Sequence, residues 1–198
     1  MTFSGELFLN GYIRSKLLNC FQNKNISFRL SISGFVCLIM FGSGCTQIQV
    51  KEGVFSPSHK EYTLNMPGGN WTLFKVGKED FALWNKQSNA MIALITSNFE
   101  NKKISLEMLN NQLFIGMKNK EVIFKEPIKI DNKEAIHTSI TCEMDNYKFK
   151  IDSYVVKAKN RVYDLVYWSP CDSFDLALGD FVDMIKSFKF LQLSESIQ

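Results

Sequence analysis

The sequence predicts an α+β fold in which an antiparallel sheet carries helices on both of its faces. Three strand-like segments near the carboxyl terminus are joined by very short turns, which forces neighbouring strands to run antiparallel. Two other segments repeat apolar residues at the spacing of an amphipathic helix. Residues 90–96 and 161–168 do not alternate between apolar and polar side chains, as expected where both faces of a sheet are covered.

Seven segments have the composition of strands and are separated by turn-forming residues. Pro127 has no backbone N–H group to give to a sheet, so we expect the fourth of these strands to be broken there. The expected strands are residues 61–66, 81–84, 90–96, 121–130, 135–144, 147–157 and 161–168.

The two shortest connections also predict which residues face each other across the last three strands. Tight turns at residues 145–146 and 159–160 fix the register of both hairpins. The resulting opposite pairs are Met144 with Tyr147, Cys142 with Phe149, Ala158 with Arg161, and Phe149 with Pro170.

Two helices are expected, each beginning after a serine that can accept a hydrogen bond from a free amide of the first turn. The first begins after Ser105 and ends near Asn119, and the second begins after Ser173. The apolar stripe of the first is Leu106, Leu109, Leu113, Phe114 and Met117, and that of the second is Phe174, Leu178, Phe181, Ile185 and Phe188.

An export signal is expected at the amino terminus. Residues 30–44 are uncharged and mostly apolar, and they follow the basic residues Lys24 and Arg29. A membrane-spanning helix needs ~20 apolar residues, so this run is short for a span. Residues 1–23 are not needed by a signal, and translation is expected to start nearer Leu17, Leu18 or Ile26.

The end of the apolar run resembles the lipobox of bacterial lipoproteins. Gly42, Ser43 and Gly44 are small residues directly before Cys45, although this family usually has Leu where Gly42 stands. The resemblance implies that the Cys45 sulfur receives a diacylglycerol and that signal peptidase II cuts between Gly44 and Cys45. The alternative is an uncleaved signal anchor in which Cys45 is incidental.

Three regions follow from these features: a signal peptide (1–44), a lipidated tether (45–59) and a globular domain (60–198). The polar tether has no clear periodicity, and a strand at residues 48–50 is the alternative to a linker there.

The order of local patterns in the domain resembles the PsbP-like family, which includes PsbP and DcrB-type lipoproteins. The resemblance covers roughly residues 60–191 and implies an α/β/α sandwich around an antiparallel sheet. It implies no chemistry, because the family members share no catalytic site. The matching patterns are Tyr62 to Leu64, Met66 to Trp71, the helix SLEMLNNQL, Ile130 to Ala135, Arg161 to Leu165, and Phe181 to Phe188.

Charge makes nucleic acid a poor partner for the domain. Residues 1–45 hold four basic residues and one acidic residue, so 4 − 1 accounts for the whole net charge of +3. The remaining 19 basic and 19 acidic residues cancel, which leaves no net basic field for a phosphate backbone.

No motif for a metal, a cofactor or a serine nucleophile is present in the expected mature chain. His59 and His137 are the only histidines. His137 beside Glu134 or Glu143 could form a base with its orienting carboxylate, so the alternative function is an envelope hydrolase with a site around His137.

Tryptophans provide the candidate binding surface. If Trp71, Trp84 and Trp168 gather on the surface, they mark a groove for a ligand or a contact for a protein. We therefore expect a non-catalytic binding or accessory module without a cofactor. It would be held at the membrane by the lipid on Cys45, would face the periplasm, more plausibly at the outer than at the inner membrane, and would bind an envelope protein or a small ligand.

Cys142 and Cys171 should remain free thiols rather than form a disulfide. The predicted register puts a whole strand between them, and two strand spacings are ~9–10 Å. Bridged Cα atoms are rarely more than ~7 Å apart. Alkylation of the unreduced, unfolded protein should therefore modify both cysteines in a peptide mass spectrum. A spectrum with neither residue alkylated would show that the register is wrong.

Overall fold

The computed structural model describes residues 49–51, 53–56, 61–75, 81–98, 104–144 and 146–191. The predicted signal peptide, Cys45 and the lipidation and cleavage assigned to them lie outside these residues, as does His59. Met1–Cys45 and Thr46–Gln198 are separate compact units, and the fold described below belongs to the second. No helix in the described ranges combines the length and the apolar character needed to span a membrane.

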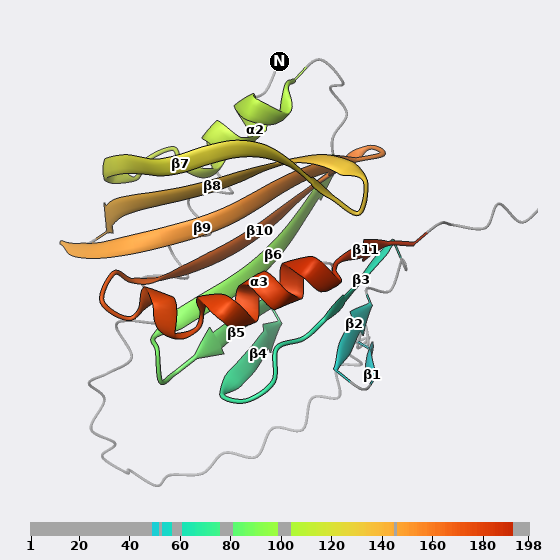
Figure 1. The fold of residues 1–198 in the computed structure, drawn as a ribbon, viewed down its shortest axis with the longest axis horizontal. Helices are drawn as coiled ribbons and strands as arrows, with labels where there is room; N and C mark the ends of the chain where they lie inside the picture. Colours follow the sequence, from blue (N-terminus) through green and yellow to red (C-terminus); the bar gives the residue numbers. More distant parts are fainter. Residues whose placement is uncertain are drawn as a thin grey trace, which may run out of the picture. The chain divides into compact units, whose positions relative to one another are not determined.

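The main feature of the fold is a seven-stranded sheet in which every neighbouring pair of strands is antiparallel (Figure 1). A smaller sheet joins the amino-terminal strands to the last strand. The large sheet has the order β4 (Trp71–Lys75), β5 (Phe81–Asn85), β6 (Ala90–Asn98), β10 (Arg161–Pro170), β9 (Tyr147–Ala158), β8 (Lys133–Met144) and β7 (Lys118–Ile130). The small sheet has the order β1 (Gln49–Lys51), β2 (Val54–Ser56), β3 (Tyr62–Asn65) and β11 (Lys189–Phe190).

The α+β class, the antiparallel pairing and the seven expected strands are confirmed, with boundaries that move by up to three residues. The predicted register of the meander β8–β9–β10 is also confirmed. Asn146 and Lys159 adopt the left-handed conformation that such tight turns require. The observed pairs include Met144 with Tyr147, Cys142 with Phe149, Ala158 with Arg161, and Phe149 with Pro170.

Helix α3 (Leu178–Ser187) packs on the face of the large sheet that carries Tyr154 and Tyr167, and we call this face the α3 face. The ring of Phe181 stacks on Tyr167 with centroids 5.6 Å apart and also contacts Tyr154 at 5.7 Å. Tyr167 donates its hydroxyl hydrogen to the carbonyl oxygen of Phe174, at 2.6 Å. Burial raises the pKa of Tyr167 to about 12.

A second aromatic cluster joins the small sheet to the large one. Tyr62 of β3 stacks on Phe188 at 5.1 Å and meets the edge of Tyr163 of β10 at 5.6 Å. The Glu61 carboxylate accepts a hydrogen bond from the Tyr163 hydroxyl. Its Oε2 atom also lies 3.2 Å from Nε of Arg161, with which it forms an ion pair. Buried rings and one shared carboxylate therefore hold β3 and the end of α3 against β10.

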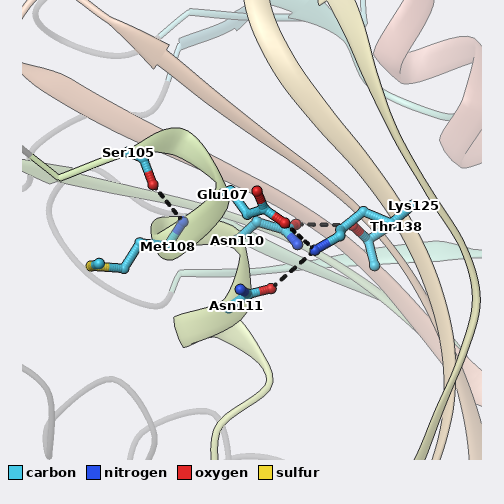
Figure 2. Close-up of polar contacts among 7 residues, drawn as sticks. All are labelled: Ser105, Glu107, Met108, Asn110, Asn111, Lys125 and Thr138. Carbon is cyan, nitrogen blue, oxygen red and sulfur yellow. Dashed lines mark hydrogen bonds and ion pairs between the residues drawn. The ribbon is translucent and has the colours of Figure 1, made fainter.

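Helix α2 (Leu106–Leu113) contacts β8 and β9 through a polar contact as well as apolar ones (Figure 2). Thr138 of β8 donates to the side-chain oxygen of Asn110, at 3.0 Å, and both residues are buried. Lys125 of β7 binds Glu107 at 2.7 Å, and this bond lowers the pKa of Glu107. Because neighbouring residues of a strand point to opposite sides, Thr138 points away from the α3 face that carries His137.

The predicted cap of α2 is confirmed, but the predicted end of the helix is wrong. Ser105 accepts a hydrogen bond from the Met108 amide at 3.2 Å. The helix ends at Leu113, six residues before Asn119, because the chain turns at residues 114–116 and Gly116 has a φ of 84°. Phe114 is buried from this turn rather than from the helix.

The start of the second helix is also different from the prediction. Ser173 makes no capping bond; a 3₁₀ turn, η1 (Phe174–Leu176), comes first, and α3 begins only at Leu178. The Ser173 hydroxyl donates instead to the carbonyl oxygen of Ser88, at 2.7 Å. This serine therefore fixes the chain after β10 to the turn before β6.

Pro127 does not break its strand, because β7 is the edge of the large sheet. Pro127 pairs with Ile136 on one side, and an edge strand needs no second partner for its backbone nitrogen. Three strands differ from the prediction: β4 was not expected, and β1 and β2 lie within the segment assigned to the tether, where a strand at residues 48–50 was the alternative. Phe55 of β2 is buried against Phe81, so the domain includes part of the predicted tether.

Replacing Leu113 by alanine should destabilise the domain by ~2–5 kcal/mol, as is typical of buried leucines. Leu113 is 5% exposed at the end of α2. Met108 on the same helix is 53% exposed and provides the matched control, for which alanine should cost well below ~1 kcal/mol. Urea unfolding measures both free energies. Equal costs at the two positions would show that α2 does not pack through Leu113.

Candidate functional site

The candidate site is a polar cluster on the α3 face, where β7, β8 and β9 lie side by side. The register places His137 opposite Glu126 and Tyr154, and it places Ser139 opposite Asp152. Residues directly opposite in antiparallel strands point to the same side of the sheet. Pairing alone therefore collects these five polar side chains on one face.

His137 is held between two carboxylates. Its Nε2 atom lies 2.8 Å from Oδ1 of Asp152, and its Nδ1 atom lies 3.6 Å from Oε1 of Glu126. The Asp152 side chain is 7% exposed and that of Glu126 is 60% exposed, so the Asp152 contact is the stronger of the two. His137 thereby links the edge strand β7 to β9.

Two aromatic rings fix the plane of the His137 imidazole. Tyr154 stacks on it with centroids 4.0 Å apart and an interplanar angle of 12°, and Phe124 meets it edge-on at 4.7 Å. Burial raises the pKa of the Tyr154 hydroxyl, and the carboxylates of Asp152 and Glu126 raise it further. The Tyr154 hydroxyl therefore lies in the field of both carboxylates and stays protonated at neutral pH.

Ser139 is the unusual member of the cluster. It is 1% exposed, and its hydroxyl oxygen is buried without a hydrogen-bond partner. Such a group costs free energy unless something completes its bonding. Its neighbours on the same face are Phe124 of β7 and Asp152 of β9.

The arrangement does not form a nucleophile–base pair. A catalytic histidine needs one ring nitrogen directed at the nucleophile and the other at an orienting group. Both nitrogens of His137 are directed at carboxylates, and the Ser139 hydroxyl makes no bond to the ring. Among the described residues, no group of three or more His, Cys, Asp or Glu side chains could hold a metal ion.

The carboxylates predicted beside His137 are not the ones that contact it. Glu134 faces Lys129 and Glu143 faces Lys118 across the β7–β8 pair, whereas the partners of His137 are Glu126 and Asp152. Asp152 could have been found, because the predicted turn at residues 145–146 already places it opposite Ser139. Glu126 could not, because the register of β7 depends on bulges near residues 119–120 and 123.

The three tryptophans of the candidate binding surface do not gather. Trp84 and Trp168 both pair with Met91 of β6, so they point to the side opposite the α3 face, and Trp168 is only 7% exposed. Trp71 points to the α3 face, where its indole nitrogen donates to Asp180 of α3, at 2.8 Å. Trp71 is therefore a contact between β4 and α3, and the three residues form no common groove.

Cys142 and Cys171 are both free in the structure. Cys142 is buried, and burial together with the neighbouring Cys171 raises the pKa of its thiol to about 11. Cys171 is exposed, and its backbone amide bonds to the carbonyl oxygen of Lys148. Near neutral pH, Cys142 is thus a neutral core side chain rather than a nucleophile.

Comparison with known proteins identifies the fold. No protein-family model matches the chain, and no curated protein sequence matches it. Among solved structures, cyanobacterial PsbP (CyanoP) from Synechocystis sp. PCC 6803 has a TM-score of 0.51 at 14% identity, and the match covers 76% of this chain and 96% of CyanoP. LpqN, a Mycobacterium tuberculosis protein involved in cell envelope biogenesis, has a TM-score of 0.54 at 9% identity, covering 66% of this chain and 83% of LpqN.

These similarities define the class of fold: the described domain is α+β and PsbP-like. The low identities carry no site residue from either protein to this chain.

Asp152→Asn should destabilise the domain by ~1–3 kcal/mol, because a buried hydrogen bond loses its charged acceptor. Glu126→Gln is the matched control on the exposed side of the same histidine, and it should cost ~0.5 kcal/mol or less. Urea unfolding at neutral pH compares the two. If the Glu126 variant is the more damaged, the buried contact is not the one that holds His137.

Proposed function

We propose that this protein is a lipid-anchored component of the bacterial cell envelope that acts as a non-catalytic binding or accessory module. Its PsbP-like domain is a sandwich in which α2 and α3 cover opposite faces of the sheet, and it faces the periplasm. The lipid on Cys45 fixes the location of the protein, and the domain provides the surface for a protein partner or a small ligand.

The lipobox carries the anchoring part of this proposal. Gly42, Ser43 and Gly44 follow an uncharged apolar run and directly precede Cys45. The similarity of the fold to LpqN, which is involved in cell envelope biogenesis, is consistent with an envelope location.

The geometry of His137 favours binding over catalysis. Nε2 of His137 contacts the buried Asp152, Nδ1 lies 3.6 Å from Oε1 of Glu126, and the ring is stacked on Tyr154, so the contacts hold the imidazole against its own neighbours. This single observation supports the proposed module over the alternative, a hydrolase around His137. The same contacts make the cluster rigid, which suits a recognition surface.

Cells that express the chain and are fed radiolabelled palmitate should incorporate the label into the wild type but not into Cys45→Ser. The thioether of Cys45 is the proposed attachment point of the lipid, and serine has no sulfur to form it. Cleavage before Cys45 should also lower the mass by ~5 kDa, from loss of the 44 preceding residues.

Cys171→Ser is the matched control, because Cys171 is an exposed cysteine outside the lipobox, and it should keep the label. Palmitate retained by Cys45→Ser would contradict the proposal. An unlabelled wild type of full mass would point instead to the uncleaved signal anchor.

A further inference from the structure

We propose that the polar cluster around Ser139 and Asp152 binds a hydroxyl group of a saccharide. This inference rests on the proposed function, because it names the ligand class of the proposed module. It uses side chains that the sequence analysis did not select, together with His137 as the residue that positions Asp152.

Two neighbouring polar atoms in the cluster are incompletely bonded. The Ser139 hydroxyl is buried and has no partner. Asp152, directly opposite on β9, is 5% exposed and uses one carboxylate oxygen for His137, the only hydrogen-bond partner of this carboxylate in the described part of the chain. A carboxylate has two oxygens and about four acceptor positions, so capacity remains.

A hydroxyl group matches this pair of atoms better than other common ligand groups. It can accept a hydrogen bond from Ser139 and donate one to Asp152 through a single oxygen atom. A carboxylate or phosphate would be repelled by Asp152 and Glu126, and an ammonium group could only donate, which would leave the hydroxyl proton of Ser139 without an acceptor. The cluster therefore selects a neutral, hydroxylated ligand.

The surroundings extend this preference from one hydroxyl to a sugar ring. Phe124, opposite Ser139 on the edge strand β7, is 39% exposed and offers an apolar ring surface. Glu126, two residues further along the same face, is exposed and can accept from a second hydroxyl. Apolar contact beside two acceptors suits a ring that has C–H groups on its faces and hydroxyls at its rim.

Access to Ser139 depends on Phe124. The two residues are neighbours on the same face, and β7 lies at the sheet edge, with register shifts on both sides of Val122. A rotamer change of this half-exposed ring needs no movement of α3, whose contact in the cluster is between Phe181 and Tyr154. In the proposed binding step, the Phe124 ring leaves its edge-on contact with His137, uncovers Ser139 and packs against the bound sugar.

Saturation-transfer NMR tests the inference with the full chain held in lipid nanodiscs. The probes are four neutral disaccharides: maltose, cellobiose, lactose and N,N′-diacetylchitobiose. At least one should receive saturation from the wild type. Its affinity should fall at least tenfold in Ser139→Ala, whose melting temperature should be unchanged or higher because an unpartnered buried hydroxyl has been removed.

Two further variants identify the site. Asp152→Asn should also weaken binding, whereas Glu134→Gln, on the opposite face of β8, should bind as the wild type does. Saturation of none of the four probes, or equal binding by wild type and Ser139→Ala, would overturn the inference. Unchanged binding in Ser139→Ala would mean that the sugar binds elsewhere. The Ser139 hydroxyl would then be hydrogen-bonded to an ordered water and not to a sugar.

The sugar-binding experiment and the palmitate-labelling experiment can fail independently of each other. Failure of palmitate labelling would remove the lipid anchor and leave the saccharide result standing. Labelled Cys45 combined with no sugar binding would remove this inference alone.

Discussion

The register of the β8–β9–β10 meander is the constraint on which the rest of the structure depends. Tight turns at Asn146 and Lys159 fix it, and a slip of one residue would turn every side chain of a strand to the other face. The observed register directs Tyr154 and Tyr167 to α3 and Thr138 to α2. Both helices therefore find their contacts through the same two turns.

The same register creates the candidate site without any dedicated loop. Asp152 faces Ser139, and His137 two residues earlier on β8 reaches Asp152 diagonally. The cluster is built on three paired strands, and β7 forms its wall at the edge of the sheet.

The sequence was sufficient where local chemistry decides the structure. Short turns gave the meander and its register, and Ser105 gave the start of α2, because both depend on a few adjacent residues. The sequence was insufficient where a residue far away in the chain determines the local structure. The hydroxyl of Ser173 binds Ser88, 85 residues away, instead of capping a helix, and Pro127 is tolerated only because β7 has no outer neighbour.

The candidate site shows the same division. His137 and its strand were predictable, and Asp152 followed from the predicted turn, but Glu126 depended on bulges in β7 that have no sequence signal. The prediction of a common tryptophan surface was wrong, because the number of residues between the tryptophans does not show which face of the sheet each one occupies. Their separation follows from pairing with Met91 and Asn85, which only the assembled sheet defines.

The central claim is that the folded domain lies outside the cytoplasm while it is held at a membrane. Protease treatment of spheroplasts from a Gram-negative host, expressing the chain with an epitope after Gln198, tests this claim most directly. The account predicts that the epitope sediments with membranes and is destroyed by added protease, while a cytoplasmic marker survives. An epitope that stays intact until the spheroplasts are lysed would contradict it.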